Sequence, residues 1–240
     1  MKESKRFLLN LIAVSFLFCL FRPALHAEVI VHDSVVRTGE EVMLEAETRG
    51  RFFRRGGEQV EFLIGGRHAG KTLSGGDGFA YRKFVPSRQG LFKIDARSGK
   101  EAGSGLLLSL EKGRSVVFVD AEGTLFSGLL SGEPREGSRK ALAVINKKFP
   151  IVILQTGLLS TSAIKTWLKE HKFPDLPVIP WDQGRVFDGI VEKGLSIKAV
   201  VAGRDVVESS GKYSPPAFSF EDTENSEEVK DWEEIRRRLR

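Results

Sequence analysis

The hexapeptide DAEGTL, residues 120–125, contains the residues of this sequence that are best suited to chemistry. It follows the β-branched and aromatic run 115–119, which predicts a strand buried on both faces. An aspartate at the carboxyl end of a parallel strand lies where open α/β sheets bind ligands, so Asp120 could be a nucleophile and a metal ligand. Glu122 is close enough to act as a general acid on a leaving oxygen. An acidic turn would explain each residue singly but explains the whole hexapeptide poorly.

The second half of the chain, residues 114–240, alternates between predicted strands and helices. After the strand at 115–119, residues 134–148 have apolar residues at helical spacing, and 151–154 form another apolar run. A third cycle begins at Ser160 as a helix cap and ends in a short strand at 177–179. This alternation predicts a doubly wound α/β sheet, in which ligands bind at the carboxyl ends of the parallel strands.

The first half, residues 28–113, shows the two-residue period of β-strands and no helical period. Apolar and polar residues alternate through 42–47 and 92–96, and glycine-rich turns separate the runs. This spacing predicts a small all-β sandwich. The stretches 76–81 and 86–94 also resemble the turn and closing strand of bacterial immunoglobulin-like modules.

The DAEGTL motif resembles the first motif, D-x-D-G-T-[LV], of the haloacid dehalogenase superfamily. Glu122 departs from the second acid, although enolase-phosphatases of that superfamily have D-x-E-G-T. The second family motif, a hydrophobic strand ending in Thr or Ser, is matched by residues 151–157. Over roughly 114–235, the resemblance implies a haloacid dehalogenase-like, Rossmann-type domain. It further implies that Asp120 attacks phosphorus, Glu122 transfers a proton and Thr156 binds the phosphate.

The resemblance also implies a lysine that neutralises the transferring phosphoryl group. Lys198 is the candidate, because it lies 24 residues before Asp222 and leaves room for a helix and a strand. Lys193 and Lys212 are the alternatives. Any of these lysines could equally be a solvated surface charge.

The fourth family motif, an acidic pair after the next strand, is matched in a degraded form by residues 218–222. Asp222 is the candidate metal ligand, and Glu227 lies where the longer form of the motif has its second acid. The resemblance therefore implies Mg²⁺ held by Asp120, the Glu122 carbonyl and Asp222.

These motifs predict a Mg²⁺-dependent phosphatase that hydrolyses a phosphomonoester through an aspartyl-phosphate. The alternative is an inactive module that binds phosphorylated lipid or glycan head groups, similar to lipin-related phosphatidate-binding domains that have lost their nucleophile. Retention of Asp120 favours the enzyme, and the degraded fourth motif favours the binder. No substantial cap insertion is visible, so the expected ligands include phosphorylated small molecules, lipids and glycans.

The first 27 residues have the pattern of a cleaved export signal: a basic head, an apolar run of 15 residues from Phe7 to Phe21, and a small residue, Ala27. The run is short for a bilayer span, which needs roughly 20 apolar residues. The expected location is therefore periplasmic or secreted, with no integral span in the mature chain.

The predicted export signal carries four basic residues and one acidic residue, so its removal lowers the formal net charge from +5 to +2. That weakens a nucleic-acid role.

Two other patterns are expected to be structural. Residues 65–72 match the phosphate-loop pattern G-x-x-x-x-G-K-[ST], but three glycines follow within six residues, so a glycine-rich hairpin is expected in place of a loop that opens a helix. His32, His68 and His171 lack the spacing of zinc ligands.

Overall fold

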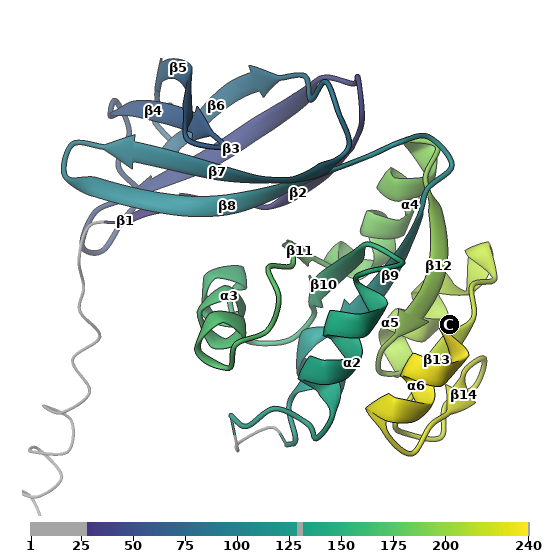
Figure 1. The fold of residues 1–240 in the computed structure, drawn as a ribbon. Helices are drawn as coiled ribbons and strands as arrows, with labels where there is room; N and C mark the ends of the chain where they lie inside the picture. The colour runs from purple at the N-terminus through teal and green to yellow at the C-terminus, as the bar shows by residue number, and fades with distance from the viewer. Residues whose placement is uncertain (1–27, 129–131, 240) are drawn as a thin grey trace, which may run out of the picture.

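The computed structural model describes residues 28–128 and 132–239 (Figure 1). The predicted export signal, residues 1–27, lies outside these ranges. Within them, the helices are all too short or too polar to cross a membrane.

The first half of the chain forms two β-sheets that pack face to face. Strand β2 pairs with β8 in parallel, and every other pairing within these two sheets is antiparallel. One sheet has the order β1 (Glu28–Val31), β3 (Val42–Arg49), β6 (Phe79–Phe84). The other has the order β2 (Ser34–Arg37), β8 (Glu101–Leu110), β7 (Gly90–Ser98), β4 (Gln59–Ile64), β5 (Arg67–Leu73).

The two-residue period of the sequence explains the core of this sandwich. In β4, Val60, Phe62 and Ile64 are buried while the residues between them are not, because successive side chains point to opposite faces. They pack in one cluster with Leu44 and Ala46 from the facing sheet. Residues 65–72 form the β4–β5 hairpin, as expected, and do not open a helix.

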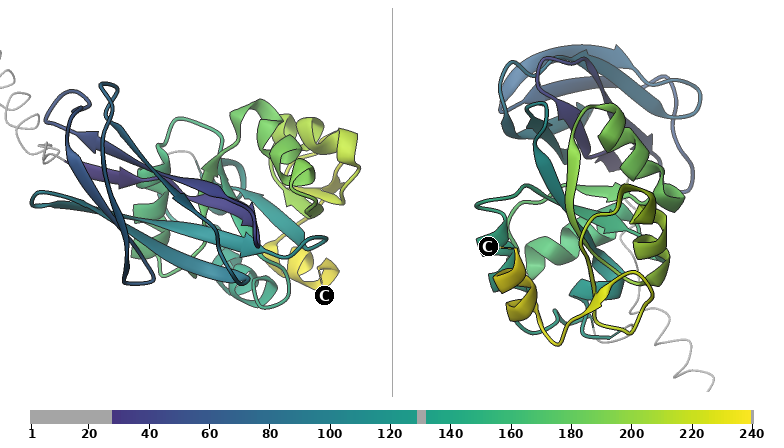
Figure 2. Two further views of the ribbon diagram at one scale, coloured as in Figure 1. Left: turned by 90° about the horizontal axis from the view of Figure 1, so that it is seen from above. Right: turned by 90° about the vertical axis from the view of Figure 1, so that its right-hand side faces the viewer.

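The second half is built on a six-stranded parallel sheet. Its order is β11 (Val178–Pro180), β10 (Ile151–Gln155), β9 (Ser115–Asp120), β12 (Ser196–Val201), β13 (Ala217–Ser219), β14 (Glu227–Glu228). Helices lie on both sides of it (Figure 2). One side carries α2 (Ser138–Ile145), α3 (Thr161–Glu170) and α6 (Trp232–Arg238), and the other carries α4 (Arg185–Glu192) and α5 (Arg204–Ser210).

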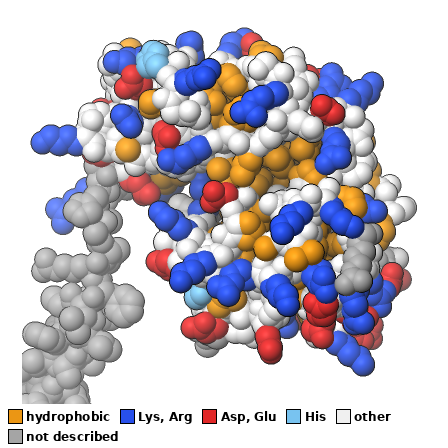
Figure 3. Space-filling model, viewed as in Figure 1, with side chains coloured by type: hydrophobic (Ala, Val, Ile, Leu, Met, Phe, Trp, Pro, Cys, Tyr) orange, Lys and Arg blue, Asp and Glu red, His pale blue; other side chains and the backbone are white. Residues whose placement is uncertain are grey.

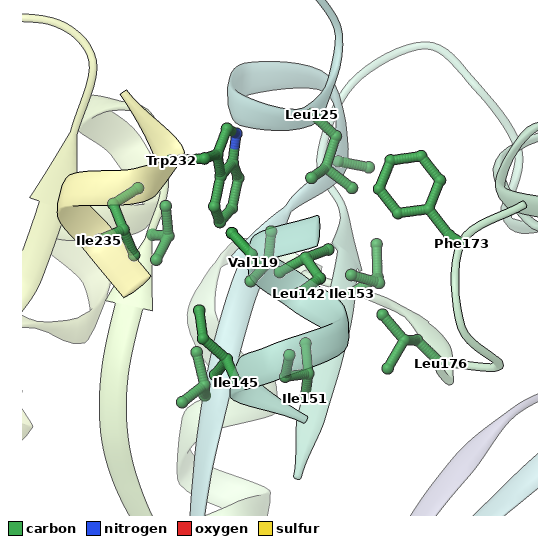
Figure 4. Close-up of a cluster of buried hydrophobic side chains, with 14 of the residues drawn as sticks. Val119, Leu125, Leu142, Ile145, Ile151, Ile153, Phe173, Leu176, Trp232 and Ile235 are labelled. Atoms are coloured by element: carbon green, nitrogen blue, oxygen red, sulfur yellow. The ribbon is translucent and has the colours of Figure 1, made fainter. Parts of the chain in front are cut away.

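Strand β9 lies in the middle of this sheet and is buried on both faces, as its apolar run predicted. Val117 and Val119 join the cluster under α2 and α6, where Trp232 is fully buried (Figure 4). Val116 and Phe118 point to the other face, and the Phe118 ring meets the Phe187 ring of α4 edge to face. Full burial of each large apolar side chain contributes about 1.5–3 kcal/mol, so β9 is held firmly where it delivers Asp120.

The parallel sheet is not closed by helices alone. Val35, Leu108 and Leu110 of the sandwich belong to the same buried cluster as Phe118 and the helices α4 and α5. A self-contained doubly wound domain would cover this face with its own helices. Here one of the three buried clusters is built from residues of both halves, while each half also has a cluster of its own.

The fold class predicted from the sequence, in which a haloacid dehalogenase-like doubly wound domain follows the sandwich, is wrong. Within the described residues, strands in three sheets dominate, and the α-helices are only seven to ten residues long. The strand and helix periods were visible in the sequence, but they do not reveal that a β-sandwich covers part of the second sheet.

A buried ion pair also joins the two halves. Asp33, between β1 and β2, accepts hydrogen bonds from the Leu106 N–H at 2.8 Å and from the Val178 N–H at 2.8 Å. The Lys165 ammonium of α3 lies 2.7 Å from the same carboxylate, whose side chain is fully buried. One acid thus bonds its own sandwich, the edge strand of the parallel sheet and a helix.

Candidate functional site

Asp120 ends β9 and is only 4% exposed. Its carboxylate accepts hydrogen bonds from the Thr156 hydroxyl at 2.6 Å, the Gly123 N–H at 3.1 Å and, more weakly, the Gly203 N–H at 3.4 Å. Burial raises the pKa of Asp120 above its ordinary value of 3.8, and these hydrogen bonds offset part of the rise. All three donors are neutral, so none of the hydrogen bonds to this buried acid comes from a cation.

The turn that follows Asp120 explains the glycine in the motif. Residues 121–125 form a short π-helical turn, and the Thr124 hydroxyl donates to the Asp120 carbonyl at 2.6 Å. A Cβ atom at Gly123 would lie 2.3 Å from Asp120 Oδ2, closer than real contacts allow. Glycine at this position therefore lets the backbone N–H approach the carboxylate.

Glu122 occupies a cradle of backbone donors in the loop after β10. Its carboxylate accepts from the N–H groups of Gly157 at 2.5 Å, Leu158 at 2.9 Å and Leu159 at 3.1 Å. This loop leads into α3, which Ser160 caps. Both carboxylate oxygens of Glu122 therefore accept hydrogen bonds from the loop. Its role in proton transfer stays a prediction from the sequence.

The structure brings together three of the predicted site residues and separates the others. Asp120, Glu122 and Thr156 meet at the ends of β9 and β10, where Asp120 is the register partner of Leu154. Lys198 lies at a bulge of β12 beside Val116 and Val117, and its ammonium sits 4.9 Å from the centre of the Phe149 ring. This position is near the start of β9, at the opposite end from Asp120.

The alternative lysines are also engaged elsewhere. Lys193 donates to the Gly189 carbonyl at 3.0 Å, and Lys212 pairs with Asp188. None of the three candidate lysines contacts Asp120 in the described structure. The predicted neutralisation of a phosphoryl group by Lys198 is therefore not supported by its position.

The described residues contain no cluster of metal-ligating side chains. Asp222 is exposed in the turn after β13, and across residues 28–128 and 132–239 no group of three or more His, Cys, Asp or Glu side chains could hold a metal. Hard divalent cations such as Mg²⁺ need several oxygen ligands converging on one point. The Asp120 carboxylate accepts hydrogen bonds from Thr156, Gly123 and Gly203. With no such group among the described residues, the description of this protein as metal-binding was wrong.

Two contacts that position this site were missed in the sequence. Gly203 follows β12 and donates to Asp120, a place that a glycine after a buried strand could have indicated. The Arg135 guanidinium donates to the Thr124 carbonyl at 3.1 Å and lies 4.2 Å from the centre of the Phe220 ring. No sequence pattern links these residues, because they meet only after the parallel sheet has formed.

A cavity of about 820 Å³ is lined in part by Thr156. It lies between the ends of β10 and β11 and helix α4, and its lining includes Gln155, Trp181, Arg185 and Lys193. Arg185 bonds Asp182 at 2.8 Å but is largely exposed. The cavity thus offers space and basic side chains next to the residues that surround Asp120.

A second groove, of about 330 Å³, runs between the sandwich and the parallel sheet. Figure 3 shows hydrophobic surface gathered at this junction, with lysines and arginines around it. Leu91, Leu108, Ile151 and Leu176 are among its lining residues. No residue of the Asp120 cluster reaches it.

A scan against protein-family models finds no match, and no curated protein matches either. Solved structures match about a third of this chain. The CARDB domain of PF1109 from Pyrococcus furiosus is 15% identical over 35% of this chain and 94% of that chain, with a TM-score of 0.28. The D00-D0 domain of intimin is 14% identical over 35% of this chain and 46% of that one, with a TM-score of 0.29. The M1 domain from titin is 14% identical over 36% and 95%, with a TM-score of 0.26.

The family predicted from the DAEGTL motif is corrected by these comparisons. The matches are CARDB, immunoglobulin-like and fibronectin-like all-β domains, and no haloacid dehalogenase is among them. The assignment to that superfamily was wrong, and so was classifying the protein as a hydrolase or phosphatase on the strength of that family. A six-residue motif at a strand end can arise from the needs of a tight turn, such as the glycine beside Asp120.

Proposed function

We propose that the Asp120 end of the parallel sheet binds a phosphorylated group, carried by a small molecule, a lipid or a glycan. One observation carries the proposal: three backbone N–H groups, from Gly157 to Leu159, already converge on a carboxylate. A phosphate offers the same kind of acceptor with more oxygens and more charge. In the ligand-bound protein, phosphate would take the place of the Glu122 side chain.

The surroundings of this cradle favour a phosphate over a carboxylate ligand. The Thr156 hydroxyl, which now donates to Asp120, lies on the same loop and can turn to a phosphate oxygen. Arg185 and Lys193 line the cavity beside it and supply positive charge for a doubly charged ligand. The size of that cavity leaves room for the remainder of the ligand.

The orientation of Asp120 favours a second candidate, phosphomonoester hydrolysis. In that reaction an Asp120 carboxylate oxygen would bond to phosphorus while the ester P–O bond breaks, and the alkoxide that leaves would take a proton from water. A second water would then hydrolyse the aspartyl-phosphate to inorganic phosphate and the free Asp120 carboxylate. The three donors hold the carboxylate at the strand end, where such an attack needs it. No step of this reaction is assigned to a metal. A Mg²⁺ requirement stays a prediction from the sequence.

Titration with inorganic phosphate, followed by calorimetry, tests the binding proposal. Glu122→Ala removes the internal competitor and should tighten phosphate binding by about tenfold, because a charge-assisted hydrogen bond contributes roughly 1.5–3 kcal/mol. Thr156→Val should weaken it. Glu224→Ala is the matched control, because it removes the same charge from an exposed turn far along the sequence. Equal affinities in Glu122→Ala and Glu224→Ala would overturn the proposal.

Phosphate release from a panel of phosphomonoesters, with and without Mg²⁺, separates the two candidates. Hydrolysis requires turnover in the parent protein and its loss in Asp120→Asn. Binding without turnover predicts no release under either condition, while the phosphate titration still gives a saturable signal. Release that persists in Asp120→Asn would exclude Asp120 as the nucleophile.

A further inference from the structure

The turn between β3 and β4 exposes two adjacent phenylalanines. Phe52 is 70% exposed and Phe53 is 84% exposed. Large aromatic side chains in water are unfavourable, and an adjacent pair at the end of a turn indicates a surface that something else covers. The core of the sandwich lies on the far side of β3 and does not include these residues.

The base of this turn is tied to the sandwich, which keeps the aromatic pair projecting. Arg49 and Arg54 form an isolated antiparallel bridge across it. The Arg55 N–H donates to the buried Thr48 carbonyl at 2.8 Å, and the Thr48 hydroxyl donates back to the Arg55 carbonyl at 2.5 Å. Because the base of the turn is already fixed, binding a partner at its tip orders few further residues and costs little conformational entropy.

Basic side chains surround the aromatic pair. Arg49 and Arg54 share a single carboxylate, Glu47, which is 2% exposed. Arg51 lies 5.3 Å from the centre of the Phe52 ring and has no ion-pair partner within the described part of the chain. The turn therefore combines exposed aromatic surface with a local excess of positive charge, although the chain without residues 1–27 carries a formal net charge of only +2.

The start of β1 places the N-terminal end of the chain beside this turn. Glu28, the first described residue, is the register partner of Arg49. The turn therefore lies at the end of the sandwich where β1 begins.

We propose that the turn formed by residues 49–55 docks on an anionic lipid bilayer. Aromatic rings partition into the interface between headgroups and acyl chains, and arginines bind lipid phosphates. An acidic soluble polymer would satisfy the arginines but would leave the aromatic rings in water. This inference is independent of the proposed phosphate site, which lies at the far end of β9.

Co-sedimentation with vesicles tests the proposal. The chain from Glu28 to Arg240 keeps every described strand and helix and removes the apolar run. It should bind vesicles of phosphatidylglycerol mixed with phosphatidylcholine, bind phosphatidylcholine alone much more weakly, and dissociate as salt is raised. The double variant Phe52→Ser, Phe53→Ser should lower the partition coefficient by about tenfold or more. Arg51→Glu should lower it by about fivefold or more.

Matched controls come from the opposite end of the sandwich. Val85 and Leu91 are exposed near the ends of β6 and β7 away from the turn, and Arg67 lies at the β4–β5 turn. Two control variants should bind vesicles within about twofold of the parent protein. One is the double variant Val85→Ser, Leu91→Ser, and the other is Arg67→Glu. Circular dichroism confirms that each variant is folded.

Two results would overturn the inference. One is a parent protein that does not bind anionic vesicles, or a double Phe variant that binds as well as its control. The other is binding to heparin, a soluble polyanion, that the double Phe variant weakens as much as it weakens vesicle binding. A Phe53→Trp variant adds a direct readout, because its fluorescence should be quenched by brominated lipids beyond the parent signal.

Discussion

Two buried aspartates in this protein have opposite surroundings. Asp33, at the junction of the two halves, pairs with the Lys165 ammonium and two backbone N–H groups. Asp120, at the end of β9, receives only neutral donors, and burial raises its pKa. The ion pair of Asp33 fixes how the two halves pack together. Asp120 has no such partner, and buried acids with a shifted pKa are candidates for ligand-binding sites.

The largest expected effect lies at the junction. Asp33→Asn leaves the Lys165 ammonium without its carboxylate, and breaking a buried pair costs about 3 kcal/mol in the free energy of unfolding. Urea denaturation measures the loss. The double variant Asp33→Asn, Lys165→Met should recover part of it, because no unpaired charge remains. If Asp33→Asn costs no more than removal of the exposed pair Lys93 and Asp95, the contrast between the two aspartates fails.

The next effect concerns the glycine beside Asp120. Gly123→Ala places a Cβ atom 2.3 Å from Asp120 Oδ2 and should cost about 1–3 kcal/mol of stability, because the turn has to shift. It should also weaken phosphate binding. Gly203→Ala is the matched control, since its Cβ would lie 3.7 Å from the same oxygen, an ordinary contact. Equal losses in the two variants would show that the Gly123 contact does not position the carboxylate.

The smallest effect is a pH dependence at Asp120. Because its pKa in the folded protein is raised, the folded state holds the proton more tightly than the unfolded state does. The contribution of this group to stability is therefore most favourable below the ordinary value of 3.8 and is lost as pH rises through the raised value. Asp120→Asn should consequently be as stable as the parent or more so at neutral pH, by about 1 kcal/mol.

Urea denaturation of parent and Asp120→Asn between pH 4 and pH 7 measures this difference. The advantage of the variant should shrink as pH falls, because the parent carboxyl becomes protonated. An advantage that grows toward low pH would contradict the assigned direction and would remove the contrast with Asp33.

The prediction of secondary structure succeeded where the spacing of apolar residues alone determines which side chains are buried. The alternation at 92–96 in β7 and the unbroken apolar run of β9 predicted which faces would be covered. The helix expected from residue 134 begins only at Ser138, because Pro134 bridges back to Phe126 and Gly137 adopts a φ of 76°. A helical pattern in the sequence does not show that its first residue forms a β-bridge with another segment and so stays outside the helix.

The sequence by itself determined that Asp120 and Thr156 each follow a buried strand, because each comes after an apolar run. The pairing of β9 with β10, which brings the two side chains together, was seen only in the tertiary structure. Only the tertiary structure decided that Glu122 would fill the loop donors and that Lys198 would pack on Phe149 at the opposite end. It also decided that Asp33 would meet Lys165, 132 residues away. Local periods specify which face of a strand is buried, whereas partners so distant in the chain depend on how the sandwich and the parallel sheet pack together.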